Sequence, residues 1–287
     1  MHTALICINL LGDSLYLLKP VQAYIEKHPE ETVSIIVEDN PANALAGELF
    51  DAQFPGRVYR SLAVAENVAR DSGDEFKSIL LQSGTAATVA FDEADGILHI
   101  SKGYARLLDV EVDDITPPSE WHTPMNPEKE YALLAPFSKS CTSHAGGRPN
   151  KTIENWKWQH IIRFLQKHKY TSIKVLGGKN DRMTAVTIPE TDYLFASSLV
   201  ELQVMLKKAH LVISLDNGIA HMASALAVDT IVMWPKVSSI DLLAPIFSPR
   251  TAIMEIGDPV VVQPVQLLDG IKRMMRGLEN RDNTDLR

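Results

Sequence analysis

The sequence predicts an α/β fold in which two Rossmann-like domains face each other across a cleft. Two observations support this prediction. Strand-like and helix-like segments alternate in both halves of the chain, and a proline-rich stretch interrupts the alternation at residues 113–130. Such alternation implies parallel sheets with helices on both faces. A length of 287 residues is sufficient for two domains, each with its own core.

The first half begins with an apolar run typical of a buried strand, Ala4–Asn9, followed by an amphipathic helix pattern at Asp13–Lys27. Strand and helix patterns alternate from there on. The further predicted strands are Val33–Val37, Arg57–Ser61 and Ser78–Gln82, and the further helices are Pro41–Phe50, Val64–Arg70 and Gly103–Leu108.

The second half resumes the alternation after four prolines within residues 113–130. We therefore predict a first domain at residues 1–115, a linker at 116–130 and a second domain at 131–287. The strands predicted in the second domain are Tyr131–Ala135, Ser172–Leu176, an apolar run from Leu211 and Thr230–Met233. The helices are Ile153–Lys167, Leu199–Ala209, one that begins at about Gly218, and Val265–Leu278.

Charge is distributed unevenly along the chain. Residues 1–115 carry 8 Lys and Arg against 19 Asp and Glu, whereas residues 116–287 carry 20 against 17, within a net charge of −8. An acidic first half argues against a nucleic-acid surface. The second half is the better host for an anionic ligand.

The sequence argues against a membrane-spanning protein, a disulfide-stabilised protein and an exported protein. No window approaches the roughly 18 apolar residues of a membrane span. Cys7 and Cys141 are too few for a disulfide framework, and the N-terminus lacks the basic and apolar regions of an export signal. We expect a cytoplasmic protein. Peripheral contact with the inner face of the membrane stays open, because Ile271–Leu278 is faintly basic and amphipathic.

Residues 211–226 form the most informative stretch, because an apolar strand pattern ends in Asp216-Asn217-Gly218 and a helix pattern follows at once. Gly218 permits backbone angles closed to other residues. A helix N-terminus offers unpaired N–H groups and a partial positive charge, which suit a phosphate, and His221 in the first turn adds a donor. An ordinary connection, with Asp216 as a cap and His221 as a packing residue, is the structural alternative.

Gly12-Asp13 follows the first predicted strand and begins a helix. A carboxylate there points into an interdomain cleft, where it can accept a proton from an attacking hydroxyl. The alternative is that Asp13 only favours the helix dipole as a cap.

Polar residues follow two further strands. Ser138 comes after Tyr131–Ala135, and Lys151 stands before a helix, where a lysine suits a bound diphosphate better than it suits the helix dipole. Asp181 follows Gly177-Gly178, and an acid there can hold ribose hydroxyls. The alternative interpretation of Lys151 is a lysine in a solvated loop. The chain has no Cys/His spacing typical of a metal site.

These residues resemble the motifs of glycosyltransferase family 9, the bacterial ADP-heptose:lipopolysaccharide heptosyltransferases and their relatives. The most specific match is Asp216-Asn217-Gly218-Ile219-Ala220-His221, which resembles the family's D-S/T-G-x-x-H signature. Ser138 and Lys151 resemble the family's Ser/Thr and the Lys of its K-x-W-P segment, and the stretch to Asp181 resembles its G-G-x-x-E region.

The resemblance implies the GT-B fold and an inverting, metal-independent transfer of a heptose-like sugar from a nucleotide diphosphate to a hydroxyl acceptor. Asp13 would be the general base. Asp216 would orient its loop rather than react, and Asp181 would hold the ribose. The implied donor-binding residues are Ser138, Lys151, Asp181, Asp216, Asn217, Gly218, Ile219, Ala220 and His221. The nucleotide sugar, such as ADP-heptose, is then a substrate, and no cofactor or metal is implied.

The implied acceptor is a glycan or glycolipid, and the implied process is synthesis of lipopolysaccharide or another cell-surface glycan. Asn217 departs from the family's Ser or Thr, and the acidic first half makes an anionic, lipid A-type acceptor less obvious than it is for a basic heptosyltransferase. Two other functions stay open: a non-catalytic nucleotide-sugar-binding protein, and a sugar-nucleotide epimerase on a similar fold.

Overall fold

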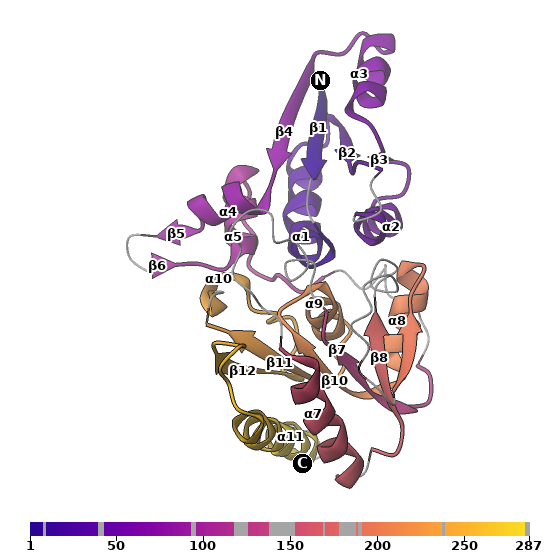
Figure 1. Ribbon diagram of the computed structural model, residues 1–287. Coiled ribbons are helices and arrows are strands. Elements are labelled where there is room, and N and C mark those ends of the chain that lie inside the picture. Colours follow the sequence, from indigo (N-terminus) through magenta and orange to yellow (C-terminus); the bar gives the residue numbers. More distant parts are fainter. Residues whose placement is uncertain are drawn as a thin grey trace. The chain divides into compact units, whose positions relative to one another are not determined.

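The computed structural model describes residues 1–7, 10–39, 43–92, 96–117, 126–137, 153–168, 170–177, 188, 191–236 and 239–284. The chain forms two compact units, each with its own parallel sheet (Figure 1). The first comprises Met1–His122 and Asp241–Leu243, and the second comprises Thr123–Ile240 and Ala244–Arg287. The short segment 241–243 therefore groups with the first unit, where the carbonyl of Leu243 accepts a hydrogen bond from the Tyr16 hydroxyl (3.3 Å).

The first unit is built on a parallel sheet with the strand order β3-β2-β1-β4. Its strands are β1 (His2–Cys7), β2 (Thr32–Ile36), β3 (Val58–Tyr59) and β4 (Phe76–Leu81), with a small antiparallel hairpin of β5 (Phe91–Asp92) and β6 (Gly96–Ile97). The helices are α1 (Leu11–Lys27), α2 (Ala44–Gln53), α3 (Leu62–Asp71), α4 (Ser83–Val89) and α5 (Ile100–Leu107).

The second unit is built on a parallel sheet with the order β12-β11-β10-β7-β8-β9. Its strands are β7 (Tyr131–Ala135), β8 (Ile173–Gly177), β9 (Asp192–Phe195), β10 (Ala209–Leu215), β11 (Thr230–Pro235) and β12 (Thr251–Gly257). The helices are α7 (Asn155–Lys167), α8 (Leu199–Lys207), α9 (Gly218–Ala225), α11 (Pro264–Thr284) and the short α10 (Ile240–Leu243), which the division of the chain splits between the units.

Each sheet has a point at which the strand order reverses. In the second unit the chain runs outward from β7 to β9 on one side and from β10 to β12 on the other, so β7 and β10 are the central pair. In the first unit β1 and β4 form the corresponding pair. Open α/β sheets bind ligands in the crevice beyond the carboxyl ends of such a pair. The fold therefore marks one candidate edge in each unit.

Burial explains why the central strands were clear in the sequence. Within β10, the side chains of Leu211, Val212, Ile213 and Leu215 are at most 2% exposed. Parallel strands covered on both faces need such continuous apolar runs. Trp158 of α7 is fully buried in the hydrophobic core that also contains Leu211, Ile213 and Leu215.

The predicted α/β class and the two Rossmann-like sheets are confirmed, and most predicted elements lie within a few residues of the observed ones. The prediction missed β9 and β12, which are the two edge strands of the second sheet and are only partly buried. It also extended a helix to Ala209, whereas α8 ends at Lys207 and Ala209 begins β10. Within the described part of the chain, no helix has both the length and the apolar content needed to cross a membrane.

Helices α4 and α5 pack so closely that position 103 has no room for a side chain. A Cβ atom on Gly103 would lie 2.8 Å from the carbonyl carbon of Ala86 and closer still to its oxygen. A backbone group cannot rotate away as a side chain can. The two helices therefore depend on a glycine at this point.

We expect Gly103→Ala to lower the free energy of unfolding by about 3 kcal/mol, since the added methyl group overpacks this contact. Gly84→Ala in α4 is the control, because nothing lies within 4 Å of a Cβ atom there. Its stability should stay unchanged or rise slightly, as alanine favours helices over glycine. Urea unfolding measures both changes, and equal stability of the two variants would contradict the close approach.

Candidate functional site

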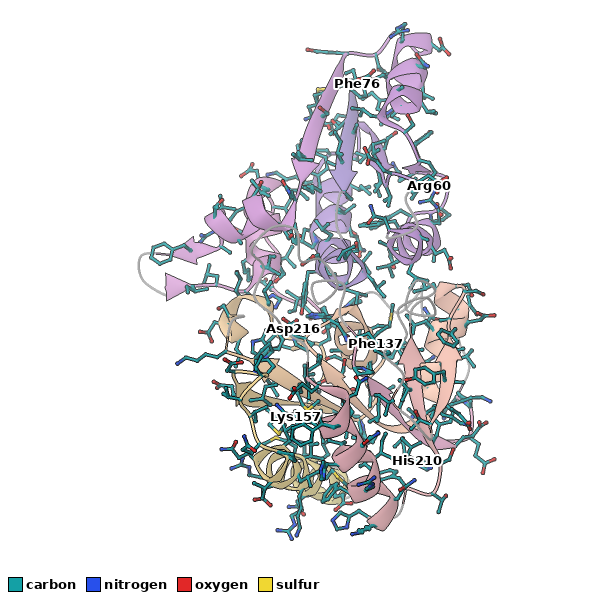
Figure 2. All side chains as sticks on the ribbon, in the orientation of Figure 1. Arg60, Phe76, Phe137, Lys157, His210 and Asp216 are labelled. Carbon is teal, nitrogen blue, oxygen red and sulfur yellow. The ribbon has the colours of Figure 1, made fainter. Side chains whose placement is uncertain are left out.

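The candidate site lies at the carboxyl edge of the second sheet, where β10 ends and α9 begins. Asp216 follows β10 directly, Asn217 is the N-cap of α9, and Gly218 is the first residue of that helix. Figure 2 labels Asp216 and Phe137 at this edge, and His210 at the opposite end of β10. The stretch that the sequence singled out thus adjoins the central strand pair.

Asp216 and His221 form a buried pair beside the start of α9. Their side chains are 7% and 8% exposed, and the Asp216 Oδ1 atom lies 3.8 Å from the His221 Nε2 atom. His221 is the fourth residue of α9, so the first helical turn brings it back toward the preceding loop. The contact becomes an ion pair when the imidazole carries a proton.

The Asn217 side chain caps α9 with its oxygen. The Oδ1 atom accepts hydrogen bonds from the amides of Ile219 (2.9 Å) and Ala220 (3.1 Å). These two amides are therefore already engaged, although the sequence offered them as donors to a ligand. Among the described residues, none accepts a hydrogen bond from the Gly218 amide.

The Asn217 amide nitrogen binds the end of β7. The Nδ2 atom donates to the carbonyls of Ala135 (3.2 Å) and Phe137 (2.9 Å). The Ser214 Oγ atom of β10 lies 3.0 Å from Asn217 Oδ1 and 2.8 Å from the carbonyl oxygen of Leu215, so these two acceptors share its one hydrogen. One side chain thus joins the two central strands to the first turn of α9.

The backbone at Gly218 differs from the sequence prediction. The prediction gave this glycine unusual backbone angles in a tight loop. The described glycines with positive φ are Gly56, Gly73, Gly96 and Gly257, whereas Gly218 takes part in α9 as its first residue. The turn is made by extended Asn217, with φ −156° and ψ 172°, so Gly218 needs no special conformation.

Asp13 lies in the first turn of α1 at the corresponding edge of the first unit. Leu10, the N-cap, makes no side-chain cap, so this helix start lacks the polar cap that Asn217 gives α9. Burial raises the pKa of Tyr104 well above its usual value, and its electrostatic interactions with Asp13 and Cys7 raise it further. Tyr104 therefore remains neutral within electrostatic reach of Asp13. Burial also raises the pKa of the Cys7 thiol, which makes it a poor nucleophile.

Three predicted donor residues, Ser138, Lys151 and Asp181, lie outside the described residues. Their roles stay predictions. The prediction missed two contributors that are described. Ser214 is a buried hydroxyl within an apolar strand, which is a signal visible in the sequence. The backbone carbonyl of Phe137 could not be recognised from the sequence, because every residue has a backbone carbonyl.

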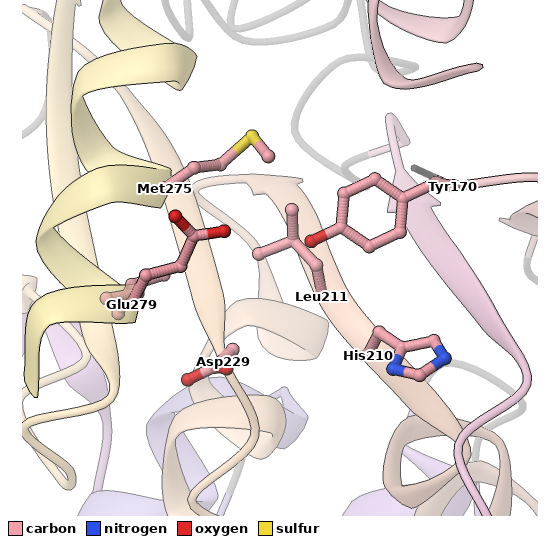
Figure 3. Close-up of a pocket in the computed structure, with 7 residues that line it drawn as sticks. Tyr170, His210, Leu211, Asp229, Met275 and Glu279 are labelled. Carbon is pink, nitrogen blue, oxygen red and sulfur yellow. The ribbon is translucent and has the colours of Figure 1, made fainter. Parts of the chain in front are cut away.

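A separate pocket of about 340 Å³ opens at the opposite edge of the second sheet (Figure 3). His210 and Asp229 line it near the starts of β10 and β11, together with Tyr170 and Glu279. Asp229 is paired with Arg250, whose Nη2 atom lies 2.8 Å from its Oδ2 atom. Because this pocket lies at the amino ends of the strands, it is distinct from the candidate site.

Among the described residues, one group of side chains places possible metal-binding atoms within 4.8 Å of one another: His28, Glu30 and Glu31. Glu31 already has a cationic partner, since Lys77 Nζ lies 3.1 Å from its Oε1 atom. The hydroxyls of Thr3 and Tyr24 donate to its Oε2 atom at 2.5 and 3.0 Å. An ammonium group at this position opposes a metal ion, so we assign the group a structural role.

A family model described as glycosyltransferase family 9 (heptosyltransferase) matches residues 97–246, just over half of the chain. The matched residues include the whole of β10 and α9. A search among curated proteins finds no match to the sequence.

Solved structures of heptosyltransferases share the fold. The similarity to E. coli ADP-heptose LPS heptosyltransferase II has a TM-score of 0.63 at 11% identity, over 97% of this chain and 100% of that one. The similarity to E. coli heptosyltransferase WaaC with ADP has a TM-score of 0.59 at 15% identity, over 97% of this chain and 100% of that one. The similarity to the glycosyl transferase family 9 protein of Veillonella parvula DSM 2008 has a TM-score of 0.61 at 12% identity, over 96% of this chain and 97% of that one. The chain therefore has the GT-B fold of these proteins.

The Glu31 network makes a prediction about acid stability. Burial alone would raise the pKa of Glu31, but hydrogen bonds from Thr3, Lys77 and Tyr24 outweigh burial and leave it below the usual 4.5. A lowered pKa in the folded state stabilises the fold above pH 4.5, and this contribution is lost as the pH falls through the folded-state pKa.

We expect Glu31→Gln to lower the free energy of unfolding by about 1–3 kcal/mol at neutral pH, the usual range for a lost hydrogen-bonded charge. The difference from the unchanged protein should shrink as the pH falls below 4.5. Glu30→Gln is the control, because the Glu30 side chain is 71% exposed. Denaturant titrations at several pH values measure the effect, and a difference that does not depend on pH would contradict it.

Proposed function

This chain belongs to glycosyltransferase family 9, and we propose that it transfers a heptose-like sugar from a nucleotide diphosphate to a hydroxyl group of a glycan or glycolipid. Membership of the family makes the chain a glycosyltransferase. What we propose is the identity of its donor, the identity of its acceptor and its mechanism. One observation carries it: the buried Asp216–His221 pair at the start of α9, at the edge where the strand order reverses. An imidazole that can donate a hydrogen bond and an open helix N-terminus at such an edge suit a diphosphate.

We propose ADP-heptose, or a closely related nucleotide sugar, as the donor. The support comes from relatives of the same fold, because structures of E. coli WaaC contain ADP and ADP-2-deoxy-2-fluoro heptose. In this chain the diphosphate is proposed to contact the Gly218 amide and His221, together with Ser138 and Lys151. The amides of Ile219 and Ala220 serve the cap instead, because they donate to Asn217.

In the proposed mechanism Asp13 accepts the proton of the acceptor hydroxyl. The oxygen then attacks the anomeric carbon as the bond from that carbon to the diphosphate oxygen breaks. A single displacement inverts the configuration at the anomeric carbon. The leaving diphosphate gains negative charge, which Lys151, His221 and the Gly218 amide stabilise. Because these groups are cationic or hydrogen-bond donors, the proposal requires no metal ion and no cofactor.

The proposal assigns the base to the first unit and the donor to the second, with Asp181 on the ribose. The process is synthesis of lipopolysaccharide or another cell-surface glycan, in the cytoplasm or at the inner face of the membrane. The heptosyltransferase II that shares the fold acts, by its title, on LPS. The acidic composition of residues 1–115 favours an acceptor of low negative charge.

We expect His221→Ala to weaken ADP binding about 10-fold to 100-fold, the cost of a lost hydrogen bond to a charged group. His210→Ala is the matched control, because His210 is exposed at the far end of the adjoining strand. Isothermal titration calorimetry with ADP and with UDP measures affinity and base preference. An equal loss of ADP affinity in both variants, or no loss of ADP affinity in either, would show that His221 does not belong to the donor site.

We expect Asp13→Asn to reduce transfer from ADP-heptose by about 10²-fold to 10⁴-fold, the usual contribution of a general base, while ADP affinity stays unchanged. Mass spectrometry of products from a panel of hydroxyl acceptors, including lipopolysaccharide core precursors, measures transfer. The control is Asp51→Asn, an exposed carboxylate of α2 that pairs with Arg60.

Three outcomes would contradict the mechanism or the activity. Full transfer by Asp13→Asn would remove this residue from the mechanism. An epimerised nucleotide sugar as the product would favour the epimerase alternative. Donor binding by the unchanged protein without transfer or hydrolysis would favour a non-catalytic binder.

A further inference from the structure

We propose that Asn217 is a positioning residue that holds the two sides of the donor site together and makes no side-chain contact with the donor. It joins the carboxyl end of β7 to the first turn of α9, across the point where the strand order reverses. The inference rests on the proposed function only for the identity of the ligand, because the contacts themselves lie within one unit.

The hydrogen-bonding capacity of the Asn217 amide nitrogen is fully used. An NH₂ group has two hydrogens. One is donated to the carbonyl of Ala135 and the other to that of Phe137. No donor hydrogen is left for a phosphate oxygen of a ligand.

The Asn217 oxygen is also saturated, and it fixes the orientation of the amide. It accepts from the amides of Ile219 and Ala220, which engage both of its lone pairs, and the Ser214 hydroxyl lies 3.0 Å away. Rotating the amide by half a turn would set its oxygen against two carbonyls and its NH₂ group against two N–H groups. The chemistry of the partners therefore allows one orientation.

Only an amide of this length satisfies both sides. An aspartate at position 217 would keep the cap but would set a negative charge against the carbonyls of Ala135 and Phe137. A serine, the residue usual at this place in the resemblance described above, can cap a helix but carries a single O–H donor. Asn217 is therefore specific to the way in which this chain closes its central strand pair.

The consequence for the donor is geometric. The Gly218 amide and His221 are carried on the first turn of α9, and the two carbonyls that bind Asn217 belong to Ala135 and Phe137 at the end of β7. If Asn217 sets the distance between these two sides, its loss moves groups that must contact the same diphosphate. Misplacement of binding groups by about 1 Å is sufficient for a large loss of activity.

The test compares Asn217→Ser and Asn217→Asp with the unchanged protein. We expect ADP to bind about 10-fold to 30-fold more weakly to Asn217→Ser, the effect of two lost hydrogen bonds, and the KM for ADP-heptose to rise more than kcat falls. Asn217→Asp should bind ADP more weakly still, since it adds a negative charge. The control is Asn67→Asp, which makes the same change at an exposed position in α3.

Hydrogen exchange gives a readout that needs no ligand. In Asn217→Ser, we expect faster exchange in peptides that cover β7 and the start of α9, with the global unfolding transition retained. Wild-type affinity for ADP and unchanged exchange in Asn217→Ser would overturn the inference. If the unchanged protein binds no ADP, the proposed donor fails, and the exchange data alone then decide whether Asn217 joins the two sides.

Discussion

The parallel pairing of β7 with β10 is the constraint on which the second unit depends. Its register places Ser214 opposite Ala135, so the two central strands end at nearly the same level. The chain continues to β8 on one side of this pair and to β11 on the other, and open α/β sheets bind ligands beyond the carboxyl ends of strands at such a reversal. Parallel strands also direct the start of every following helix toward one edge. The buried pair of Asp216 and His221 lies beside the helix start at that edge.

Local sequence patterns were sufficient to predict the elements, but not their arrangement. A buried parallel strand is a continuous apolar run, so β7 was predicted with its observed bounds. The strand order depends on pairing between segments up to about 80 residues apart, such as Ala209 with Tyr131, and no local pattern records it. Edge strands such as β12 gave a weak signal because one side of them remains partly exposed.

The candidate site was predicted in its residue types rather than in its contacts. The order Asp216-Asn217-Gly218 and the helix behind it were visible in the sequence. The prediction gave the unusual backbone to Gly218, because a glycine in a turn is the usual signal for it. In the structure the side chain of Asn217 makes the turn instead, with partners that include a strand carbonyl 82 residues away in the sequence. The contributions of Ser138, Lys151 and Asp181 stay predictions.

The grouping of Asp241–Leu243 with the first unit has a consequence for how the chain folds during synthesis. The Tyr16 hydroxyl bonds to a carbonyl 227 residues further along the sequence. The first half can form its sheet early, because β1 to β4 end at Leu81. It cannot acquire its full set of contacts until most of the second half has left the ribosome. The two units are therefore joined by more than a single linker, and shortening the chain to its first 122 residues would remove part of the first unit as well as all of the second.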